Sequence, residues 1–90
     1  MHESEWLKKW LIAIAVDPEM NGEAYRVLLV ILAEMNHNNV SDISSGEISK
    51  ILKKDSSNTR RAIKLLCKRG VIRKHYYGKT LAGFIISEPF

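Results

Sequence analysis

The stretch SSNTRRAIKLLCKRG, residues 56–70, has the pattern of a single amphipathic helix. An α-helix advances about 100° per residue, so residues three or four apart share a face. One face then carries the polar and cationic side chains of Ser57, Arg61, Lys64 and Lys68. The opposite face carries Thr59, Ile63 and Leu66. The sequence therefore predicts a helix that turns one face to a core and leaves a cationic face open to a partner.

A capping box marks the start of a shorter helix just upstream. In SSGE, residues 44–47, the first serine and the glutamate can each cap a backbone amide at the other's position. Ile43 and Ile48 are placed around this box as a hydrophobic staple. The positions of this helix that are predicted to face inward are Ile48, Ile51 and Leu52.

Only three or four residues separate these two helices, because Asp55 and Ser56 are both N-cap candidates for the helix at 56–69. Gly70 is a favourable residue just beyond the end of that helix. Two short helices joined by a tight turn, the second of them basic, predict a helix-turn-helix.

The rest of the chain reads as two further helices and a hairpin. Residues 4–16 have apolar residues at helical spacing, and Pro18 cannot continue that helix. A second helix starts at the N-cap Asn21 and reaches Asn36, and its centre is apolar nearly all round. Residues 37–43 predict a turn and a short extended stretch, and residues 71–86 predict a hairpin that turns at Gly78-Lys79. The predicted fold is mainly α with a small β-hairpin.

The net charge of +4 hides a division between the two halves of this 90-residue chain. Through Ser45 there are three basic and seven acidic residues, a net charge of −4, whereas from Gly46 onward eleven basic residues face three acidic ones, a net charge of +8. This asymmetry predicts a polyanionic partner for the second half, nucleic acid before membrane.

Other classes of protein find little support in the sequence. No apolar run approaches the length of a membrane span and no signal peptide is evident, so a soluble, cytoplasmic protein is expected. With Cys67 as the only cysteine, zinc binding is disfavoured, and Cys67 itself reads as a small core residue. We find no nucleophile–base pairing, glycine-rich phosphate loop or convincing carboxylate pair, and therefore expect no enzyme, no metal or other cofactor and no small-molecule ligand.

Candidate DNA-contacting residues follow from the helix-turn-helix prediction. The second helix of such a unit enters the major groove with its N-terminal residues leading, where Arg can bridge guanine and Asn can pair with adenine. The candidates on the two helices are Ser45, Ser56, Ser57, Asn58, Arg60, Arg61, Lys64 and Lys68. Lys64 and Lys68 are better placed for phosphates than for bases. The hairpin adds Lys74, Tyr77 and Lys79, although strand alternation turns one of Tyr76 and Tyr77 inward.

This order of elements resembles the winged helix-turn-helix fold. The line SSGEISKILKKDSSNTRRAIKLLCKRGVI, residues 44–72, is similar to the wing-bearing modules of MarR-like and Crp-like regulators. Residues 17–36, DPEMNGEAYRVLLVILAEMN, resemble the lead-in helix of regulators and replication proteins of bacterial plasmids and phages. The resemblance implies a DNA-binding regulator whose helix 56–69 reads the major groove and whose wing, residues 71–86, contacts the backbone or the minor groove. Relatives often have a small residue or Gly where this chain has Lys53-Lys54-Asp55.

Residues 1–16 form a predicted N-terminal helix and dimerisation element ahead of a DNA-binding domain at 17–90. The predicted homodimer interface consists of Trp6, Leu7, Trp10, Leu11 and Ile14. These residues could instead be core, and the basic face of helix 56–69 could be no more than a solvated surface. An alternative function is a protein–protein interaction module that docks on an acidic partner.

Overall fold

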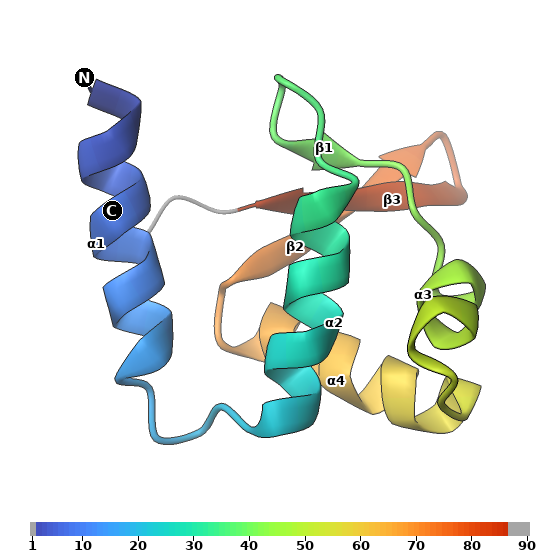
Figure 1. Cartoon of the computed structure of the whole chain (residues 1–90). Helices are drawn as coiled ribbons and strands as arrows, with labels where there is room; N and C mark the ends of the chain where they lie inside the picture. Colours follow the sequence, from blue (N-terminus) through green and yellow to red (C-terminus); the bar gives the residue numbers. More distant parts are fainter. Residues whose placement is uncertain (1, 87–90) are drawn as a thin grey trace.

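Within residues 2–86, the part of the chain that the computed structural model describes, four helices and three strands follow one another (Figure 1). They are α1 (His2–Ala15), α2 (Gly22–Ala33), β1 (Val40–Ser41), α3 (Ser45–Leu52), α4 (Ser56–Lys68), β2 (Ile72–Tyr77) and β3 (Thr80–Ile86). Side chains are described from residue 5 onward, and the last four residues of the predicted domain 17–90 lie outside the described range. The elements form a compact α/β domain that combines helices with a hairpin.

The predicted capping box is present at the start of α3. The Ser44 hydroxyl oxygen accepts a hydrogen bond from the Glu47 amide at 3.1 Å, and the Glu47 carboxylate accepts one from the Ser44 amide at 3.2 Å. These bonds satisfy amides that have no partner inside the helix. Ile43 and Ile48, the predicted staple, are both buried.

The turn between α3 and α4 depends on a lysine in an unusual conformation. Lys53, which ends α3, has φ 54° and ψ 46°, the left-handed region that glycine most often occupies at helix ends. The Lys54 amide then donates to the Ser49 carbonyl at 3.1 Å and closes the end of the helix. Lys53 therefore makes this turn in the conformation that glycine most often supplies.

Helix α4 ends in a Schellman motif, as the glycine after it predicts. The Gly70 amide donates to the Cys67 carbonyl at 3.1 Å and the Val71 amide donates to the Leu66 carbonyl at 2.9 Å. Gly70 has φ +75°, which favours glycine because it has no Cβ. The reversal sends the chain directly into β2 and fixes where the hairpin leaves α4.

The hairpin belongs to a three-stranded antiparallel sheet in the order β1-β3-β2. The extended stretch predicted before α3 is β1, which pairs Val40 with Ile85 and Ser41 with Phe84. In the hairpin, Lys74 pairs with Phe84 and His75 with Gly83, and a bulge then shifts the register. In Figure 1 α2 passes in front of this sheet, α1 stands to its left and α3 to its right, and α4 lies below it.

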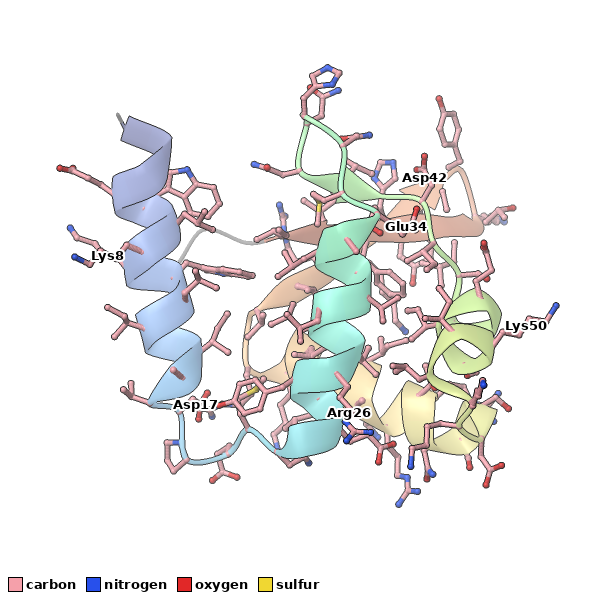
Figure 2. The ribbon with its side chains drawn as sticks, in the orientation of Figure 1. Lys8, Asp17, Arg26, Glu34, Asp42 and Lys50 are labelled. Atoms are coloured by element: carbon pink, nitrogen blue, oxygen red, sulfur yellow. The ribbon has the colours of Figure 1, made fainter. Side chains whose placement is uncertain are left out.

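Helix α1 is part of the same core as the other elements. Trp10 is 2% exposed and Ile14 is 6% exposed, and both belong to the buried apolar cluster. The Tyr25 hydroxyl of α2 donates to the Ile14 carbonyl at 3.0 Å. Where α1 ends (Figure 2), the Asp17 carboxylate accepts a hydrogen bond from the Arg69 guanidinium at 2.7 Å, and this bond lowers the pKa of the Asp17 carboxyl. The predicted division between residues 1–16 and 17–90 therefore does not separate two cores.

Three local predictions differ from the structure. Helix α2 ends at Ala33 rather than Asn36, and Asn36 caps the following turn by accepting amide hydrogen bonds on its side-chain oxygen. Ile51, predicted to face inward, is 55% exposed because α3 turns Ile48 and Ser49 to the core instead. Tyr76 and Tyr77 are both exposed, although one of them was expected to pack inward, because burial in β2 is confined to its first residue.

No helix between residues 2 and 86 is long and apolar enough to cross a membrane.

Candidate nucleic-acid interface

The two faces of α4 are divided as the sequence predicts. Its buried residues are Thr59, Ala62, Ile63 and Leu66. Its outward face exposes Ser56, Ser57, Arg60, Arg61, Lys64 and Lys68. We call this outward face, together with the half-buried Asn58, the basic face. A row of cations on one helix surface is suited to contact phosphates that lie along it.

The buried face of α4 is held by one polar contact that the sequence did not predict. The Ser49 hydroxyl of α3 donates to the Thr59 hydroxyl at 2.8 Å, and both side chains are almost fully buried. A buried pair satisfied in this way fixes the rotation of α4 against α3, since loss of one partner leaves the other unsatisfied. Placing Thr59 on the inward face was correct, but nothing in the sequence identified its partner.

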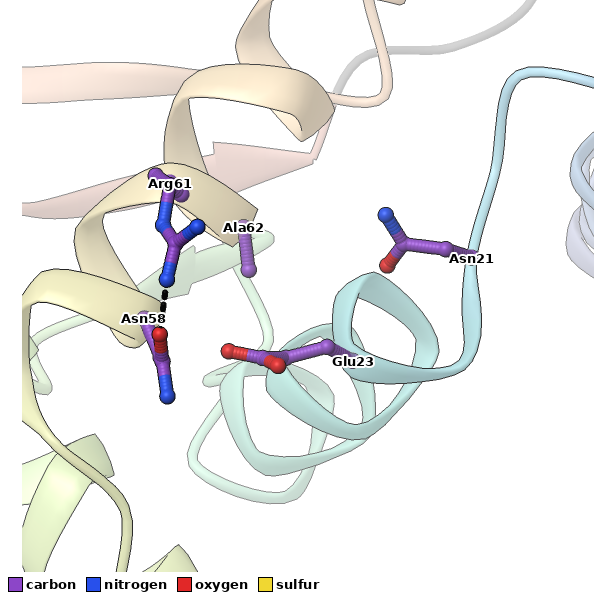
Figure 3. Close-up of a pocket in the computed structure, with 5 residues that line it drawn as sticks. All are labelled: Asn21, Glu23, Asn58, Arg61 and Ala62. Atoms are coloured by element: carbon purple, nitrogen blue, oxygen red, sulfur yellow. Dashed lines mark hydrogen bonds between the residues drawn. The ribbon is translucent and has the colours of Figure 1, made fainter.

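An acidic side chain borders the basic face on the side of α2. Arg61 donates a hydrogen bond to the Asn58 side-chain oxygen, and both residues line a pocket of about 350 Å³ with Asn21, Glu23 and Ala62 (Figure 3). Glu23, in the first turn of α2, points toward this pair. This carboxylate beside the basic face was not predicted from the sequence. The Glu23 carboxylate limits the positive area on the α2 side of the basic face. On the other side, toward the sheet, the positive area is larger.

On its other side the basic face continues onto β2. Lys74 lies opposite Phe84 in the hairpin, and cross-strand partners share a sheet face, so Lys74 projects on the face that α4 covers. Ser45, at the start of α3, lines the same groove as Arg60, Lys64 and Lys74. Within residues 5–86, no carboxylate forms an ion pair with any of these three cations, whereas Arg69 is paired with Asp17.

The tip of the hairpin is exposed and aromatic. Tyr77 is 79% exposed and its ring meets His75 edge-on, with ring centroids 6.3 Å apart. Lys79, in the turn, is also exposed. Alternation along β2 puts Tyr76, which is 53% exposed, on the sheet face that α4 covers, whereas Tyr77 lies on the other face. The candidate tyrosine of the sequence prediction is therefore the one farther from the basic face.

The predicted dimer residues divide into buried and exposed sets. Trp10 and Ile14 lie inside the core of this chain and offer little surface to another one, which corrects their assignment. Trp6 is half-buried and packs edge-on against Trp10 with ring centroids 6.4 Å apart. Leu7 and Leu11 are 40% and 47% exposed.

One of the exposed leucines of α1, Leu11, adjoins apolar side chains of α2. Leu11, Leu29 and Leu32 line a cavity of about 220 Å³ between the two helices. Leu29 is 65% exposed. We call Leu7, Leu11, Leu29 and Leu32 the α1–α2 apolar surface.

Among the described side chains, no three His, Cys, Asp or Glu residues gather closely enough to hold a metal ion. Comparison of the chain with protein-family models, with curated protein sequences and with solved structures finds no match in any of the three.

Proposed function

We propose that this chain is a sequence-specific double-stranded DNA-binding protein of the winged helix-turn-helix type, acting as a transcriptional regulator or as the DNA-binding protein of a plasmid or phage replicon. The observation that carries the proposal is the basic face of α4, which is exposed while the opposite face is buried. In this reading α3 and α4 are the helix-turn-helix and β2–β3 is the wing.

The basic face divides by chemistry into two parts. Arg60, Arg61 and Asn58, in the first half of α4, have side chains that can form paired hydrogen bonds with guanine or adenine edges in the major groove. Lys64 and Lys68, in the second half, supply point charges for phosphates and set the position of the helix on the duplex. Lys74 and Lys79 extend the charged track along the wing.

The proposed mechanism is positional and needs no chemical step. A protein bound at its site excludes other proteins from that site or recruits them to it. The free energy for this comes from phosphate contacts, and the choice of site comes from base contacts.

Arg60→Ala and Arg61→Ala should each weaken binding to the preferred duplex by about 1–3 kcal/mol, because each removes a side chain that pairs with a base. The preferred duplex is obtained first, by in vitro selection from random sequences. Binding of each variant is then measured on the selected duplex and on a random one, and the loss should be larger on the selected duplex. Unchanged binding by both variants, with their folds intact, would remove the recognition role from α4. A chain that docks on acidic proteins instead should yield no preferred site in the selection.

The α1–α2 apolar surface supports a homodimer, which would bring two copies of α4 to a two-fold symmetric site. The wild type should sediment as a dimer at high micromolar concentration, and Leu29→Glu should sediment as a monomer, because it puts a charge into the interface. Arg26→Glu, on the exposed surface of the same helix, is the matched control and should stay dimeric. A monomeric wild type at that concentration contradicts the dimer.

A further inference from the structure

The outer face of the sheet carries side chains that the basic face does not use. On the inner face, Ile72 of β2 and Phe84 of β3 are buried in one cluster with residues of α2 and α4. Because side chains alternate along a strand, Arg73, His75 and Tyr77 lie on the opposite face. The edge-on contact between the His75 and Tyr77 rings, with centroids 6.3 Å apart, agrees with this placement. We call these three residues the outer row.

The outer row is open and free of acidic neighbours on its own hairpin. Arg73 and Tyr77 are exposed, and His75 is half-buried. Gly83, which has no side chain, lies opposite His75 in the register. The two strands of the hairpin contain no Asp or Glu, and Asp42, which follows β1, is separated from β2 by β3. An anionic partner that lies along β2 therefore meets a cation and two rings but no carboxylate of the hairpin.

We infer that the outer row is a binding site for single-stranded DNA. Unpaired bases would stack on the rings of Tyr77 and His75, and Arg73 would contact a phosphate of the same strand. Aromatic stacking combined with positive charge along the backbone is how proteins hold single strands without reading their sequence. A duplex fits this row poorly, because its bases are stacked inside the helix and offer no free face to an aromatic ring.

The choice of DNA over RNA rests on the proposed function. A duplex held by the basic face of α4 would lie against the other side of the same hairpin, where Lys74 projects. DNA strands that separate next to that duplex are the nearest single strands to the outer row. The two sides of the hairpin would then hold two forms of one DNA molecule, double-stranded on one side and single-stranded on the other.

Tyr77→Ala should weaken the binding of an oligo-dT of about ten nucleotides by about 5- to 150-fold, the equivalent of one stacked base. Oligo-dT does not pair with itself, so it offers no duplex to α4. Tyr77→Phe keeps the ring and should bind as tightly as the wild type. Tyr76→Ala is the matched control and should bind nearly as tightly as the wild type, since Tyr76 is 53% exposed and lies on the opposite sheet face. Fluorescence anisotropy of labelled oligo-dT measures each affinity.

Equal weakening by Tyr76→Ala and Tyr77→Ala, or no binding of oligo-dT to the wild type, would overturn the proposal. A loss in Tyr77→Phe as large as that in Tyr77→Ala would overturn the stacking role of the ring. Tighter binding of oligo-rU than of oligo-dT would overturn the choice of DNA. If Tyr77→Ala loses oligo-dT binding in a chain that selects no preferred duplex, the outer row stands and the proposed function fails. If a preferred duplex is found but Tyr77→Ala keeps its affinity for oligo-dT, the outer row alone fails.

Discussion

Trp10→Ala should destabilise the protein by about 3–5 kcal/mol, the usual cost of removing a fully buried aromatic side chain. Trp10 is 2% exposed and lies on α1, the helix that the sequence assigned to a separate dimerisation element. Its indole fills space against the core that α2, α4 and the sheet share. Urea unfolding followed by far-ultraviolet circular dichroism measures the change, at a protein concentration low enough to exclude association.

Ile12→Ala is the matched control for Trp10→Ala. Ile12 lies on the same helix and is 52% exposed, so its truncation should change the free energy of unfolding by no more than about 0.5 kcal/mol. A similarly small change for Trp10→Ala would mean that α1 is an appendage and not part of the fold.

Gly83→Ala should be about as damaging, at about 2–6 kcal/mol, the sum of overpacking and backbone strain. A Cβ built at Gly83 lies 2.0 Å from the Ser41 carbonyl oxygen and 3.0 Å from the Asp42 Cα. Both atoms belong to the backbone and cannot turn aside. Relief therefore requires β1 to move away from β3, and the hydrogen bonds of that pair would open. Urea unfolding gives the energy, and amide hydrogen exchange at Ser41 reports the opening.

Gly22→Ala makes the same chemical change where space is free, with no heavy atom within 4 Å of the added Cβ. It should be neutral, or stabilising by about 0.4–1 kcal/mol through the unfolded chain. If Gly83→Ala were as harmless as Gly22→Ala, the close approach of β1 to β3 would be wrong.

The parts of the fold that the sequence predicts are those decided by neighbouring residues. Three features depend only on residues that lie within one or two helical turns of each other. They are the capping box at Ser44, the Schellman motif at Gly70 and the division of α4 into two faces. Local chemistry of this kind leaves a readable pattern, because the residue type and the backbone conformation constrain each other at the same position.

The parts that the sequence does not predict depend on residues far apart in the chain. In the sequence, Gly83 is simply a residue of a predicted hairpin strand. The need for a glycine there becomes visible only when β1, about 40 residues earlier, lies against it. The helical spacing of Trp10 fits either a residue of a dimer interface or a residue of the core. Only its place in one buried cluster with residues of α2 and α4 shows that it is a core residue.

The same reason explains what was missed at the candidate site. The Ser49–Thr59 hydrogen bond joins two separate elements, and Glu23 with Arg61, like Leu81 with Lys64, lines one pocket from two separate elements. The exposed residues of α4 could be predicted because the periodicity of one helix assigns them to one face. The groove beside them could not, since part of its wall comes from the sheet.

The most direct test of the central claim is the salt dependence of duplex binding, measured with random-sequence DNA between about 50 and 200 mM salt. We predict that Lys64→Ala lowers the slope of log K against log salt by about one unit, because one phosphate contact is lost. Lys8→Ala removes the same charge from the outer side of α1 (Figure 2), and we predict that it leaves the slope unchanged. A wild-type chain that does not bind duplex, or equal slopes for the wild type and Lys64→Ala, would contradict the assignment of the basic face of α4 to DNA.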